Sequence, residues 1–158
     1  MSEQDDVIGE LEGLGVLAGV RWAYRAATWR TLEIFSEPDG HDAALLGNLG
    51  HTLFRDRLDR VFACDRYDLQ PGSAATAHLD LLYAELAQEH INTIPRVPTN
   101  LVRRAALNGS PGWAIGDRRF LLASCTCHGL DNLPWPRKSP TKQRVARQRQ
   151  LIPRRPPV

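Results

Sequence analysis

The residues with the clearest chemical potential are basic and lie near the C-terminus of the 158-residue chain. After Asp131 there is no Asp or Glu, and the cations are interleaved with prolines and glutamines. Such a cluster of mobile cations can neutralise phosphates and release their counterions. This segment therefore predicts contact with nucleic acid, through Arg137, Lys138, Lys142, Arg144, Arg147, Arg149, Arg154 and Arg155.

The basic segment is part of a wider charge asymmetry. Residues 1–93 carry sixteen acidic and seven basic side chains, a net charge of −9. Residues 94–158 carry thirteen basic and two acidic side chains, a net charge of +11. An asymmetry of this size indicates an anionic partner. Three other interpretations stay open: the halves could attract each other, the basic segment could merely keep the protein soluble, or it could bind an acidic protein.

A second group of arginines lies between residues 96 and 119 and suggests a winged helix. A helix over 75–91, a helix over 100–107 and a hairpin over 113–123 would follow in the order helix, helix, wing. Basic residues on the second helix and on the wing would contact groove and backbone. The link from Ile91 to Thr99 is longer than the usual helix-turn-helix turn, which weakens this interpretation. The residues concerned are Arg103, Arg104, Arg118 and Arg119.

The motif Cys125-Thr126-Cys127-His128 contains side chains that can bind zinc. Its spacing is not the C-x2-C of structural zinc sites, and no second pair follows it. Cys64 is the remaining cysteine. The pattern is more typical of buried free thiols, so we expect neither a metal nor a cofactor.

Catalytic groups are present but do not form a recognised set. His78 and His90, with nearby acids, could supply acid–base chemistry, yet no nucleophile–base–orienter arrangement is evident. The chain has no lysine before Lys138, which argues against a nuclease that combines acids with a lysine. The sequence therefore favours a protein without enzymatic activity, and a small His-dependent nuclease remains an alternative.

The elements that would position these residues indicate an α+β fold with three to four helices and a small β-hairpin. Ser2 and Asp5 form a capping box for a first helix, and 42–63 is the clearest helix. Residues 16–35 are ambiguous. Alternation favours strands at both ends, whereas Trp22, Ala26 and Trp29 would share one helical face. We expect strands there.

The charges of the 42–63 helix follow an i,i+4 pattern. Arg55 with Asp59, and Asp56 with Arg60, are spaced to pair along one side of the helix. We interpret these alternating charges as a solvated face. We further expect a single globular domain over 1–130, followed by a Pro/Arg-rich tail over 131–158 that is disordered when free.

Composition limits the class of protein. No run approaches the ~18 apolar residues of a membrane span, and the acidic N-terminus does not resemble a secretory signal. We therefore expect a soluble bacterial cytoplasmic protein, with a homodimer as one option. The leading hypothesis is a regulatory or accessory factor that binds DNA rather than RNA. The alternative is a protein–protein adaptor or antitoxin-like module whose tail orders on an acidic partner.

Overall fold

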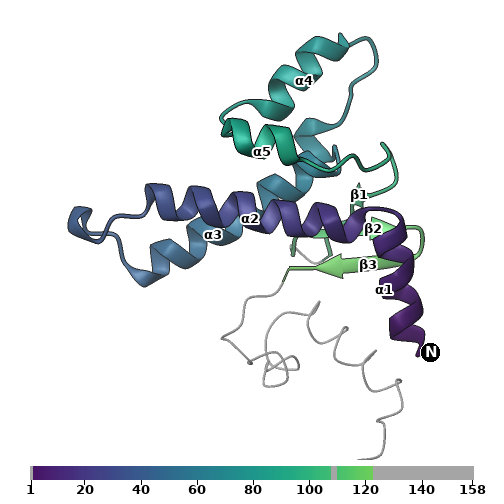
Figure 1. Cartoon of the computed structure of the whole chain (residues 1–158), viewed down its shortest axis with the longest axis horizontal. Helices are drawn as coiled ribbons and strands as arrows, with labels where there is room; N and C mark the ends of the chain where they lie inside the picture. The colour runs from purple at the N-terminus through teal and green to yellow at the C-terminus, as the bar shows by residue number, and fades with distance from the viewer. Residues whose placement is uncertain (1, 108–109, 123–158) are drawn as a thin grey trace, which may run out of the picture. The chain divides into compact units, whose positions relative to one another are not determined.

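A computed structural model of the chain describes residues 2–107 and 110–122 (Figure 1). The fold is α+β, as predicted, and combines α-helices with a small antiparallel sheet of strand order β1-β2-β3. The chain divides into two compact units, Met1–Arg104 and Ala105–Val158. The predicted boundary at residue 131 lies outside the described residues. The elements are α1 (Glu3–Gly13), α2 (Val16–Ile34), η1 (Glu37–Asp39), α3 (Ala43–Val61), η2 (Asp65–Tyr67), α4 (Ala75–Tyr83), α5 (Gln88–Thr93), β1 (Arg103–Arg104), β2 (Gly112–Ile115) and β3 (Arg118–Leu121).

Helix α1 begins with the capping box that the sequence predicts. The Ser2 hydroxyl accepts a hydrogen bond from the Asp5 amide at 3.2 Å, and the Asp5 carboxylate accepts one from the Ser2 amide at 3.1 Å. Two amides that a helix start leaves unpaired are thus satisfied. Gly15, with φ of 79°, then separates α1 from α2 in a conformation that favours glycine.

Helix α2 corrects the prediction of strands at both ends of 16–35, because this segment is one continuous helix. The stripe of Ala23, Ala26 and Ala27 is buried, and α2 packs along α3 (Figure 1). Small side chains let two helices approach closely, and that packing outweighs the short alternation of apolar residues. One close approach is at Gly19, where an added Cβ would lie 3.1 Å from the Phe62 ring.

Helix α3 confirms the helix predicted over 42–63. Asp42 caps its start by accepting a hydrogen bond from the Leu45 amide at 2.9 Å. Near its other end Leu58, Val61 and Phe62 are buried. These side chains form part of the core of Met1–Arg104.

The single helix predicted over 75–91 is instead two helices, α4 and α5. The chain turns at Glu85, which has a positive φ of 60°. Arg60 donates hydrogen bonds from Nη1 to the carbonyl oxygens of Leu82 and Ala84, at 2.5 and 2.9 Å. A cation that binds the last carbonyls stabilises a helix end. The break therefore depends on a residue far away in the sequence.

The helix predicted over 100–107 does not form. Asn100 adopts a left-handed conformation with φ of 65°, and residues 103–104 form strand β1. Just beyond β1, the Ala105 amide donates to the Gly112 carbonyl oxygen at 2.9 Å. Strand pairing therefore takes the backbone groups that a helix would need. The predicted winged helix lacks its second helix.

The predicted hairpin is confirmed, as β2 and β3. Trp113 pairs with Phe120 and Ile115 with Arg118 in an antiparallel register. The connection is Gly116-Asp117, and Gly116 has the positive φ that such tight turns require.

The described residues were also searched for a membrane span. None of their helices combines the length and the apolar character needed to cross a bilayer.

We predict opposite effects for two glycine substitutions in the helical pair. Gly19→Leu places a side chain where even a Cβ is crowded, and overpacking of this kind costs about 1–3 kcal/mol. Gly47→Ala, in α3, adds a Cβ that meets nothing within 4 Å and should raise stability by about 0.5–1 kcal/mol. Urea denaturation of both variants measures the difference. Equal stability of the two proteins would contradict the packing of α2 on α3.

Candidate functional site

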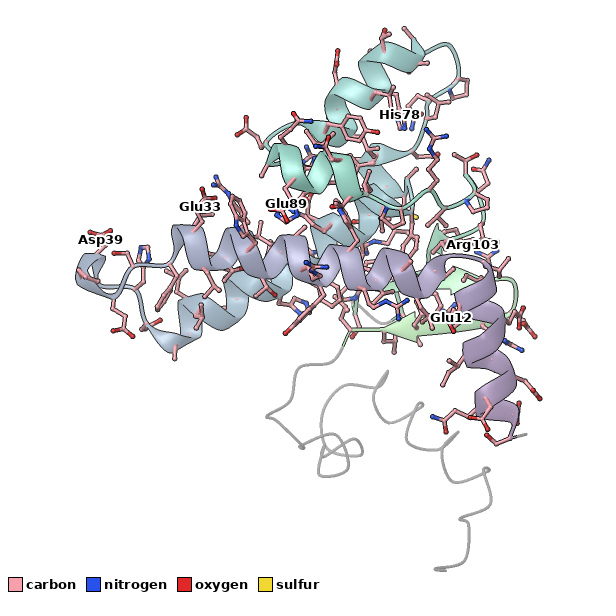
Figure 2. All side chains as sticks on the ribbon, viewed as in Figure 1. Glu12, Glu33, Asp39, His78, Glu89 and Arg103 are labelled. Atoms are coloured by element: carbon pink, nitrogen blue, oxygen red, sulfur yellow. The ribbon has the colours of Figure 1, made fainter. Side chains whose placement is uncertain are left out.

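The two predicted arginines of β1 differ in their surroundings. Arg104 binds Asp59 through two hydrogen bonds, from Nε to Oδ1 at 2.8 Å and from a second guanidinium nitrogen to Oδ2 at 3.1 Å. The hydrogen bond to Asp59 raises the pKa of Arg104 above its ordinary value. Arg103 is exposed (Figure 2). Arg104 thus joins β1 to α3.

The charged side of α3 is buried, which corrects its interpretation as a solvated face. Arg57, Asp59 and Arg60 are only 5%, 5% and 6% exposed. The predicted pair of Asp56 with Arg60 does form, with Nε 2.8 Å from Oδ2. Because charges are rarely buried unless they are paired, we describe these side chains and their partners as one cluster.

Asp56 is the centre of this buried ion cluster, which comprises Asp56, Arg57, Asp59, Arg60, Tyr67 and Arg104. Its carboxylate accepts hydrogen bonds from Arg57 Nη1 at 2.7 Å, from Arg60 Nε and from the Tyr67 hydroxyl. Burial opposes ionisation of Asp56, but these hydrogen bonds outweigh it and hold its pKa below the usual value. Burial and the hydrogen bond to Asp56 raise the pKa of Tyr67 to about 12.

Cys64 lies beside the cluster as a buried thiol. Its Sγ donates a hydrogen bond to the Val102 carbonyl oxygen at 3.1 Å. Burial, assisted by the nearby Asp59 charge, raises the pKa of Cys64 to about 12. The thiolate is the reactive and metal-binding form of cysteine. In the metal-free protein at neutral pH, Cys64 is therefore almost entirely the unreactive thiol.

The buried ion cluster is built for structure rather than for proton transfer. The pKa values of Asp56, Cys64 and Tyr67 are all displaced away from neutrality. A general acid or base works best with a pKa near the operating pH. We therefore assign the cluster the role of joining α3 to α4 and to β1.

The other predicted arginines lie on β3 or outside the described residues. Arg118 and Arg119 are exposed, opposite Ile115 and Ala114 in the hairpin. The motif of Cys125, Cys127 and His128 is not described. Within residues 2–107 and 110–122, no three His, Cys, Asp or Glu side chains converge on a metal site. Also outside the described residues are Arg137, Lys138, Lys142, Arg144, Arg147, Arg149, Arg154 and Arg155.

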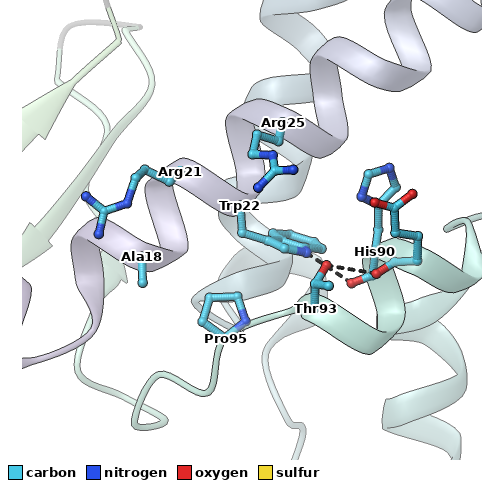
Figure 3. Close-up of a pocket in the computed structure, with 8 residues that line it drawn as sticks. Ala18, Arg21, Trp22, Arg25, His90, Thr93 and Pro95 are labelled. Carbon is cyan, nitrogen blue, oxygen red and sulfur yellow. Dashed lines mark hydrogen bonds between the residues drawn. The ribbon is translucent and has the colours of Figure 1, made fainter.

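A pocket of about 300 Å³ lies between α2 and the segment that contains α5 (Figure 3). The Trp22 indole Nε1 donates to the His90 carbonyl oxygen at 3.0 Å, which joins the two helices. The His90 ring packs edge-on against Trp29, 5.2 Å between centroids. The lining residues are Ala18, Arg21, Trp22, Arg25, Glu89, His90, Thr93 and Pro95.

Sequence reasoning did not find this pocket. The spacing of Trp22, Ala26 and Trp29 on one helical face indicated a helix in this segment. The alternation of apolar residues at both ends of the segment instead led to a prediction of strands. The partner segment lies 68 residues further along the chain, and no local pattern joins Trp22 to His90.

Comparison of the chain with protein-family models, curated proteins and solved structures gave no match.

We predict that Asp56→Asn destabilises the protein in a pH-dependent manner. The folded pKa of Asp56 is lowered, so its contribution is present at neutral pH and is lost as the pH falls below about 4. Breaking a buried pair costs about 3 kcal/mol or more, which we expect at pH 7. The difference from the unmodified protein should narrow at pH 3.

Denaturant unfolding at the two pH values measures this effect. The matched control is Asp80→Asn, an exposed change on α4 that should alter stability by less than about 0.5 kcal/mol. The same loss for Asp56→Asn at pH 7 and pH 3 would show that its charge is not what stabilises the cluster.

Proposed function

We propose that the protein binds nucleic acid, DNA in preference to RNA, through the positive charge of Ala105–Val158. The observation that carries this proposal is a change of sign at the boundary between the two compact units. Residues 1–104 have a net charge of −6, and residues 105–158 have a net charge of +8. An extended polyanion should therefore be attracted to the second unit and repelled by the net charge of the first.

The internal pairing of the first unit supports the same assignment. Three of its ten arginines, Arg57, Arg60 and Arg104, bind Asp56 or Asp59. Arg104 would have to give up a two-pronged contact with a buried carboxylate before it could bind phosphate. We therefore transfer its predicted role to Arg103, Arg118 and Arg119 and to the basic residues beyond Asp131.

The proposed contacts are to the nucleic-acid backbone. Arg118 and Arg119 are neighbours on a strand, and successive strand side chains point to opposite faces. A nucleic acid bound on one face of the strand can thus contact only one of these two arginines well. Most of the affinity must then come from the eight basic residues after Asp131. Phosphate contacts position a protein without reading sequence. This favours an accessory or regulatory role over recognition of one operator.

A second candidate is an adaptor that binds an acidic protein. Exposed apolar side chains on α2 favour it, since Tyr24 and Leu32 are 59% and 65% exposed. Exposed apolar groups that gather together can mark protein-binding surfaces. A pull-down that recovers one acidic partner after nuclease treatment would support the adaptor.

We predict that deletion of residues 137–158 reduces the salt dependence of duplex binding. Each phosphate neutralised contributes about 0.9 to the slope of log K against log salt, so loss of eight cations should remove several units. A gel-shift series between 50 and 200 mM salt measures the slope.

Two variants separate charge from other effects. Replacing the six tail arginines by lysine preserves the charge and should preserve the slope. Arg30→Gln removes an exposed arginine of α2 that pairs with Glu33 and should leave the slope unchanged. If the full-length protein does not bind duplex DNA or RNA at 50 mM salt, the proposal is wrong.

A further inference from the structure

The pocket between α2 and the α5 segment is lined by charged and polar side chains that are unrelated to the positive charge of Ala105–Val158. Its volume of about 300 Å³ is at the lower end of the range for small-molecule sites. All eight lining residues belong to Met1–Arg104. The pocket can therefore be considered independently of nucleic-acid binding.

Two arginines line one side of the pocket. Arg21 and Arg25 are four residues apart on α2, which places them on the same side of the helix. Arg21 is 4.0 Å from Glu12 with both side chains 65% exposed, a weak contact, and within the described residues Arg25 makes no ion pair. Like charges at this spacing repel each other. An anion between them would remove that repulsion.

His90 lies on the opposite side of the pocket, where its ring packs against Trp29. His90 is 9% exposed, and its Nε2 has no hydrogen-bond partner among the described residues. Because solvent does not reach this nitrogen, His90 forms a wall of the pocket and we assign it no hydrogen bond to the ligand. Trp22 fixes this side in place through its hydrogen bond to the His90 carbonyl oxygen (Figure 3).

Glu89 limits the choice of anion. It lines the pocket and is exposed, so its negative charge would repel a bare phosphate. The same carboxylate would accept hydrogen bonds from hydroxyl groups. The lining thus suits a ligand that carries an anion and hydroxyl groups together.

We propose that this pocket binds a small phosphate monoester that carries hydroxyl groups. Arg21 and Arg25 bind the phosphate, which bears a charge of about −1.5 to −2 at pH 7. Glu89 accepts hydrogen bonds from the hydroxyl groups. A phosphodiester fits less well, because it carries one negative charge and is flanked on both sides by sugars.

The test is a set of separate titrations of the full-length protein with ribose 5-phosphate, ribose and inorganic phosphate. Each titration is monitored by NMR of the Trp22 indole and His90 imidazole nitrogens. Ribose 5-phosphate should shift both signals, and ribose should shift neither. Arg25→Gln should weaken ribose 5-phosphate at least tenfold, as expected for loss of a charge-assisted hydrogen bond. Glu89→Gln should tighten inorganic phosphate and reduce the preference for the sugar phosphate.

Two further measurements serve as controls. Arg30→Gln, on the same helix but outside the pocket, should bind ribose 5-phosphate like the unmodified protein. Arg25→Gln should leave duplex binding unchanged. The proposal is overturned if millimolar ribose 5-phosphate shifts neither signal, or if Arg25→Gln weakens DNA as strongly as it weakens the sugar phosphate.

Discussion

The pairing of Asp56 and Asp59 with arginines is the interaction on which the first compact unit depends. Two carboxylates on one turn of α3 bind Arg57, Arg60 and Arg104. Arg60 also binds the carbonyl groups that end α4, and Arg104 brings β1 to α3. Removal of one member would leave a buried charge without its partner, which is far more costly than loss of a surface pair. The cluster thus fixes two chain segments to α3.

The same pairing determines which charges remain available for a partner. The arginines of the buried ion cluster are neutralised within Met1–Arg104, a unit that has a net charge of −6. The positive charge of Ala105–Val158 has no comparable number of acids in its own unit, which contains only Asp117 and Asp131. The two sites that we propose therefore call for different ligands: an extended polyanion for one unit and a small phosphate monoester for the other.

Short sequence patterns correctly predicted the elements that are stabilised by residues close to one another in the sequence. The capping box of Ser2 with Asp5, helix α3 and the turn at Gly116-Asp117 each depend on neighbouring residues. The predictions for α2 and for residues 100–107 were wrong, because packing on α3 and strand pairing are not visible in short windows. The pocket and the burial of Asp59 depend on partners 68 and 45 residues away, so the sequence alone could not reveal them.

The central claim of the proposal is that nucleic acid contacts the chain from Arg103 onward and leaves the helices of the first unit untouched. Amide hydrogen exchange of the full-length protein, with and without duplex DNA at low salt, tests it most directly. We expect slower exchange in β3 and in the residues that follow it, with no change in α1, α2 or α3. Protection within α2 or α3, without any after Ala105, would contradict the account.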